Sequence, residues 1–98
     1  MWRHGDVLIA QIQSIPPGAT SLPHCILAEG ELTGHSHRVE GSGVAELFKV
    51  GDERYLRVLV ESASVIHQEH RTITLPRGIY RVWGQREYTP QAIVRVRD

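Results

Sequence analysis

The chain has 98 residues, 41% hydrophobic and 22% charged, with a formal net charge of zero. This length predicts one domain, residues 1–98, with a thin core, and no apolar run approaches the roughly 20 residues that cross a membrane as a helix. One cysteine, Cys25, excludes an internal disulfide and predicts a structural thiol, and the first residues lack the apolar stretch of a signal peptide, so we expect a cytoplasmic protein.

The first half of the chain consists of short β-branched runs separated by glycine, proline and aspartate, a pattern typical of all-β proteins. We expect strands at residues 6–12, 24–29, 32–40 and 44–50. Ile15-Pro16-Pro17-Gly18 ends the first strand, because proline cannot donate a ladder hydrogen bond and glycine permits positive φ.

The second half repeats this pattern. Gly51-Asp52-Glu53 predicts a hairpin turn, and Pro76-Arg77-Gly78 predicts a second turn, because proline presets φ for it. The whole chain therefore predicts a small all-β barrel or sandwich of about eight short strands. The strands expected in the second half are residues 55–61, which continue at 64–67, then 72–75, 79–83 and 92–96.

Four of the six histidines form two close pairs, and these are the strongest functional signal. His35 and His37 stand two positions apart in an expected strand, so their side chains project from the same face. Gly34 precedes them and allows the backbone to bend. Imidazole is the commonest metal ligand in proteins, so this pair predicts two adjacent ligands of one metal ion.

The second pair, His67 and His70, stands three positions apart, a spacing that brings side chains together on a helix and not on a strand. Both rings reach one metal only if the chain turns between them. The polar residues from Gln68 to Arg71 are compatible with such a turn. We therefore expect His35, His37, His67 and His70 to converge on one ion.

The metal expected at such a site is a divalent transition metal: Zn, Fe, Ni, Cu or Mn. A metal held by three histidines with one open position would activate water for hydrolysis or oxygen chemistry on a small molecule. A metal held by four protein ligands would be structural. Glu40 or Glu69 is a candidate fourth ligand or general base. The alternative is that the histidines are exposed or bonded to backbone, as we expect for His4 and His24.

A different hypothesis comes from the charge distribution. Residues 1–70 hold five Arg and Lys against nine Asp and Glu, whereas residues 71–98 hold six Arg against two acids. Aromatic residues lie among the arginines of this C-terminal part, as in proteins that bind single-stranded nucleic acid. The C-terminal third is therefore either a solvated face that attracts the acidic part, or an interaction module for a partner protein, nucleic acid or a second copy of the chain. Those aromatic and basic residues are Tyr80, Arg81, Trp83, Arg86, Tyr88, Arg95 and Arg97.

Several motifs together resemble a family of small uncharacterised bacterial proteins of about this length. The resemblance covers nearly the whole chain and implies no assigned activity. The motifs are His4-Gly5-Asp6-Val7-Leu8, Leu32-Thr33-Gly34-His35-Ser36-His37, His67-Gln68-Glu69-His70, Leu75-Pro76-Arg77-Gly78-Ile79-Tyr80-Arg81-Val82 and Gln85-Arg86-Glu87-Tyr88-Thr89-Pro90.

A looser resemblance is to cupins. Gly30, His35 and His37 are similar to the first cupin motif, and Pro76 and Gly78 to part of the second. The pattern departs from cupins, because Glu40 comes too early and Glu46 too late for the acidic ligand, and Arg81 stands where the second motif has histidine. The resemblance then implies that His67 or His70 replaces the missing ligand.

Overall fold

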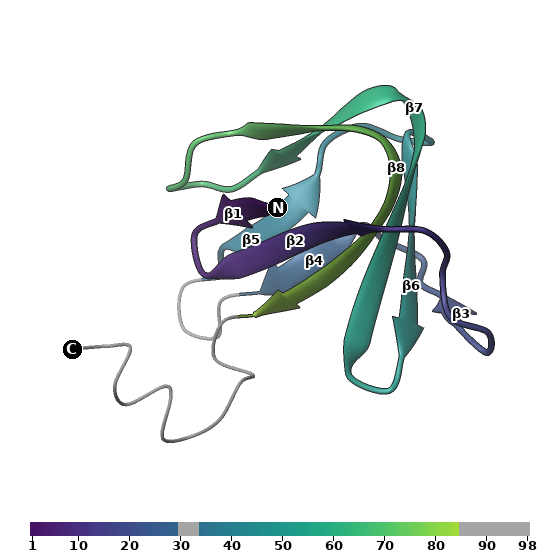
Figure 1. Cartoon of the computed structure of the whole chain (residues 1–98). Helices are drawn as coiled ribbons and strands as arrows, with labels where there is room; N and C mark the ends of the chain where they lie inside the picture. The colour runs from purple at the N-terminus through teal and green to yellow at the C-terminus, as the bar shows by residue number, and fades with distance from the viewer. Residues whose placement is uncertain (30–33, 85–98) are drawn as a thin grey trace.

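A computed structural model describes residues 1–29 and 34–84. Every described pair of strands is antiparallel, and the described residues contain no helix, so the predicted all-β class is confirmed (Figure 1). None of the described segments has the helical length and hydropathy needed to cross a bilayer. The strands are β1 (Trp2–His4), β2 (Val7–Ile12), β3 (Thr20–Ser21), β4 (Ile26–Glu29), β5 (Ser36–Val39), β6 (Ala45–Val50), β7 (Glu53–Ile66) and β8 (Ile73–Gly84).

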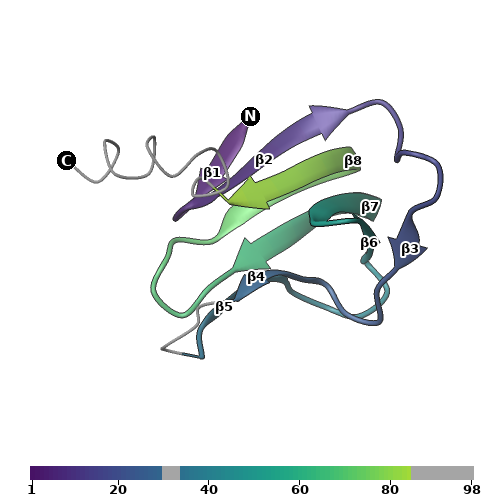
Figure 2. The ribbon, with the colours of Figure 1, turned by 90° about the horizontal axis from the view of Figure 1, so that it is seen from below.

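The strands form one sheet in the order β1-β2-β8-β7-β5-β4, with β6 also paired to β7 and β3 to β6. The long strands β7 and β8 bend where their register shifts, between Val58 and Ser62 of β7. Before this bend β7 pairs with β6, and after it with β5. The sheet therefore curls, and its two halves face each other across the core, as Figure 2 shows from below.

We name the halves by their strands. The first half-sheet contains β1, β2, β3 and β6 with the adjoining parts of β7 and β8, and the second contains β4 and β5 with the remaining parts. Within the described residues β1 and β4 are the two ends of the path, so the sheet is an open, sandwich-like curl. Arg54 of β7 connects the halves, because its Nη1 donates to the carbonyl oxygens of Ile26 (2.6 Å) and Leu27 (3.1 Å) in β4.

The predicted turn at Pro76-Arg77-Gly78 is wrong. These residues lie inside β8, at the bend where the β7–β8 register shifts, and Pro76 pairs with Ser62. Proline is tolerated at such an irregularity because it interrupts a ladder that is already broken. The Tyr80 hydroxyl donates to the Pro76 carbonyl oxygen across the bend. The chain therefore changes direction here without reversing, and the strands expected between residues 55 and 83 form two long strands, β7 and β8.

At the N-terminus, strand β1 was not expected. Gly5 and Asp6 form a two-residue turn that pairs His4 with Val7, and Gly5 has φ +66°. A glycine of positive φ at the first central position is typical of a type II′ hairpin turn. Trp2 fixes β1 to the core by packing edge-on against Tyr80, with ring centroids 5.5 Å apart. The expected strand at residues 92–96 lies outside the described residues.

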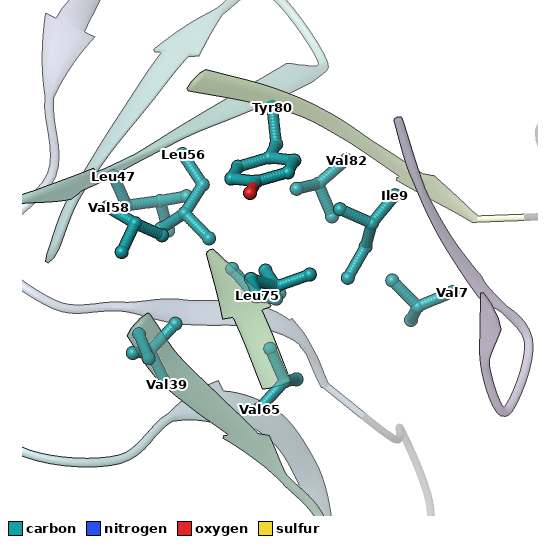
Figure 3. Packing of buried hydrophobic residues seen from close by; sticks show 12 residues of the cluster. Val7, Ile9, Val39, Leu47, Leu56, Val58, Val65, Leu75, Tyr80 and Val82 are labelled. Carbon is teal, nitrogen blue, oxygen red and sulfur yellow. The ribbon is translucent and has the colours of Figure 1, made fainter. Parts of the chain in front are cut away.

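The core fills the space between the half-sheets (Figure 3). Leu47, Leu56 and Tyr80 of the first half-sheet are fully buried, and they face Val65 and Leu75 of the second. This arrangement follows from strand alternation, which places every second side chain on the inner face. Cys25 packs at the border of this core, where its thiol donates to the Ala45 carbonyl oxygen and burial raises the pKa of the thiol.

Candidate metal centre

Histidine side chains from three separate segments meet at one edge of the space between the half-sheets. The segments are the end of β1, the start of β5 with the residue before it, and the β7–β8 connection. Neighbouring rings in this histidine cluster have centroids 4.3 to 6.3 Å apart. The cluster consists of His4, His35, His37, His67 and His70.

Three of these histidines form a group that could hold a metal ion. One ring nitrogen from each of His37, His67 and His70 lies within 4.8 Å of the other two. Tetrahedral zinc, with bonds of 2.0–2.1 Å, places its ligand nitrogens roughly 3.3 Å apart, so modest side-chain rotations would close the triad. His37 is buried, His67 is half-buried and His70 is exposed, so the triad runs from the interior to the surface.

The turn that the second histidine pair requires is present. The chain bends between His67 and His70, and the Glu69 amide donates to His67 Nδ1 at 2.9 Å. The Ser36 amide donates to Gln68 Oε1 at 3.2 Å, which ties this bend to the start of β5. Both members of the pair therefore belong to the triad.

His35 lies beside the triad and not within it. Strand β5 begins at Ser36, so the alternation expected to align His35 with His37 applies to His37 alone. His35 Nδ1 is 3.4 Å from Glu69 Oε1, and its ring centroid is 5.5 Å from that of His67. His35 is thus a neighbour of His67 at the outer side of the cluster.

His4 belongs to the cluster, although the sequence did not single it out. It ends β1, is 2% exposed, and its Nδ1 lies 2.8 Å from Nδ1 of His37. The signal that would have found it is the Gly5-Asp6 turn, which marks a hairpin between Trp2–His4 and the next strand. His24, in contrast, is exposed as expected, and its Nδ1 accepts from the Ile26 amide.

The backbone of Gly5 forms part of the wall of the site. A Cβ atom at this position would lie 2.7 Å from His70 Nε2 and 3.0 Å from His37 Cε1. Its φ of +66° is a conformation that side-chain-bearing residues seldom adopt. Glycine therefore serves both the turn and the close approach of two imidazoles.

Burial, followed by the neighbouring rings, favours the neutral form of three of these imidazoles, those of His4, His37 and His67. Burial, then the neighbouring rings of His67 and His4, lower the pKa of His37 to about 4, against the opposing effect of Asp6. Burial is also the main cause that lowers the pKa values of His4 and His67. Only neutral imidazole has a lone pair for a metal, so His37 and His67 present free nitrogen donors near pH 7.

An open pocket of about 470 Å³ adjoins the triad. Asp6 and Glu69 line it beside the histidines, and Asp6 Oδ1 lies 3.6 Å from His37 Nε2. Glu40, the other candidate acid, follows β5 and does not line the pocket. An ion held by three imidazoles here would have a coordination position facing solvent and two carboxylates close by.

Comparison with protein-family models places the chain in a family. A family model described as a domain of unknown function, DUF8820, covers residues 3–85, which include all five clustered histidines. The chain belongs to this family. The match agrees with the predicted membership of an uncharacterised family, while the cupin resemblance stays a prediction. No curated protein and no solved structure matches the chain.

The basic C-terminal third is described only in part. Tyr80 is a core residue, and Arg81 pairs with Glu53 at 3.0 Å and stacks over Trp83 at 4.8 Å. Arg86, Tyr88, Arg95 and Arg97 lie outside the described residues. The interaction module therefore stays a prediction.

Proposed function

We propose that this chain binds one divalent transition-metal ion through His37, His67 and His70. The convergence of their ring nitrogens within 4.8 Å of one another is the observation that carries the proposal. The nitrogens come from two segments far apart in sequence, so their convergence is a property of the fold and not of a local histidine-rich stretch.

The burial of polar ring nitrogens in the cluster, which is unfavourable in itself, supports the same proposal. Apolar side chains would fill the edge of the core without a desolvation cost, whereas buried imidazoles need partners for their polar nitrogens. The Nε2 of His4 is buried and meets no hydrogen-bond partner of normal geometry among the described residues. A metal ion at the triad would instead give the ring nitrogens a partner by coordination.

The donor set suits zinc and also iron, nickel, copper and manganese, because imidazole binds all of these ions. Three protein ligands beside an open pocket match the arrangement of sites that exchange water or bind a small molecule. Glu69 and Asp6 are then candidates for a fourth ligand or for a base that accepts a proton from bound water. The reaction class that fits is metal-assisted hydrolysis or oxygen chemistry on a small molecule.

Metal analysis of the protein tests this proposal. Untagged protein should contain about one transition-metal ion per chain, and zinc at 100 times its dissociation constant should raise the free energy of unfolding by about 2.7 kcal/mol. The triple substitution of His37, His67 and His70 by alanine should abolish both effects. His24→Ala is the matched control, because it removes an exposed histidine outside the cluster. Absence of metal, together with no stabilisation by any of the five ions, would sink the proposal.

A further inference from the structure

The two nitrogens of His37 face different surroundings. Nδ1 points to the ring of His4, with the two Nδ1 atoms 2.8 Å apart. Nε2 points toward the pocket side, where Asp6 Oδ1 lies 3.6 Å away. A separation of 2.8 Å between two ring nitrogens is a hydrogen-bond distance, so one ring donates a proton and the other accepts it.

Metal binding fixes the direction of this hydrogen bond. The nitrogen that binds a metal carries no proton, and Nδ1 of His37 is occupied by His4, so the metal ligand is Nε2. A neutral imidazole then carries its proton on Nδ1 and donates it to His4. His4 must accept through its own Nδ1 and hold its proton on Nε2.

We propose that His4 is a positioning residue of the metal site: its Nδ1 accepts the hydrogen bond from His37 Nδ1–H, which holds Nε2 of His37 unprotonated and directed at the metal. This inference rests on the proposed metal-binding function. In this arrangement His4 contacts a ligand, His37, and not the ion itself. In many metal sites a carboxylate or a backbone carbonyl has this place, whereas here a second imidazole has it.

The packing of His4 fits this role. Its side chain is buried at the end of β1, and its ring meets His37 edge to face, with centroids 4.9 Å apart and planes at 78°. The Gly5-Asp6 turn follows at once and pairs His4 with Val7, which fixes its backbone. The ring is thus fixed by its burial and by its contact with His37.

Two substitutions of His4 separate positioning from simple space filling. His4→Asn keeps an acceptor oxygen close to the place of Nδ1, whereas His4→Phe keeps a ring and removes the acceptor. We expect His4→Phe to weaken zinc binding by about 10–100-fold, the usual effect of losing such a partner, and His4→Asn to stay within a few-fold of the wild type. Zinc dissociation constants are measured at pH 7.5 by competition with a chromophoric chelator.

A stability measurement on the metal-free protein tests whether His4 only stabilises the fold. The midpoint of thermal unfolding of His4→Phe should equal or exceed that of the wild type, because the substitution removes a buried imidazole in favour of an apolar ring. Equal zinc affinity in His4→Phe and wild type would overturn the proposal, as would a loss in His4→Asn as large as in His4→Phe. If the wild type binds no metal, the proposed function itself fails, and this inference fails with it.

A direct measurement on the wild type needs no variant. Long-range ¹H–¹⁵N correlation spectra of the zinc-loaded protein report which nitrogen of each histidine carries the proton. His37 should be protonated on Nδ1 and His4 on Nε2. A His4 ring protonated on Nδ1 would reverse the hydrogen bond and overturn the proposal, even if both His4 variants fail to fold.

Discussion

The chain makes a two-residue Gly-Asp turn twice, in very different surroundings. Gly5-Asp6 connects β1 to β2 and Gly51-Asp52 connects β6 to β7, with glycine φ values of +66° and +59°. A Cβ at Gly5 would collide with two imidazoles, whereas a Cβ at Gly51 would meet nothing within 4 Å. The same local chemistry therefore builds a plain hairpin in one place and the wall of a candidate metal site in the other. The surrounding fold, and not the turn, makes the difference.

Acidification should destabilise the protein, because it protonates His37, which lies beside the Gly5-Asp6 turn. The pKa of His37 falls from 6.5 to about 4 on folding, so the unfolded chain binds more protons between these pH values. The stability that depends on neutral His37 is complete above about pH 6.5 and is lost as the pH falls to 4. The loss is at most about 3 kcal/mol. Urea unfolding of the metal-free protein from pH 4 to 8 measures it, and a flat profile over this range would contradict the burial of neutral imidazoles.

Alanine at the two turn glycines compares the turns directly. Gly5→Ala and Gly51→Ala should each lower the free energy of unfolding by about 1–2 kcal/mol, because both place a side chain at positive φ. Only Gly5→Ala should also weaken zinc binding, since its Cβ displaces the rings of His70 and His37. Denaturant unfolding and zinc titration of both variants measure these effects. Equal zinc affinities in the two variants would show that Gly5 does not shape the site.

The two turn aspartates give the smallest expected difference. Asp6 raises the pKa of His37, so Asp6→Asn should lower that pKa further, while Asp52→Asn should leave it unchanged. Asp6 is largely exposed, so solvent screens the interaction and its contribution stays below about 1 kcal/mol. NMR titration of the His37 ring in the metal-free variants measures the shift. A higher pKa in Asp6→Asn would reverse the assigned sign.

The sequence predicted the second turn and missed the first for a physical reason. Gly51-Asp52 stands between two long alternating runs, and this contrast marks a hairpin. Before Gly5-Asp6 stand only four residues, too few to show a period, so β1 and His4 went unrecognised. Likewise, proline and glycine at residues 76 and 78 predicted a reversal, but the β7–β8 register shift turned them into a bend.

For the site, sequence spacing predicted the residue types better than their grouping. The sequence spacing of His35 and His37 predicted that these two share a strand face, yet the triad combines His37 with His67 and His70. Spacing along one strand says nothing about which other segment packs against it, and this depends on the pairing of β5 with β7. Long-range contacts of this kind are set by the whole fold.

The ladder between β2 and β8 has a consequence for the order of assembly. The β1–β2 and β7–β8 hairpins are local and close quickly, but His4 and His70 come together only after β2 has paired with β8 across most of the chain. The contact between His4 and the triad is therefore completed late. An ion bound by the completed site would therefore slow unfolding of the native state. It would not raise the folding rate, because the site forms after the transition state.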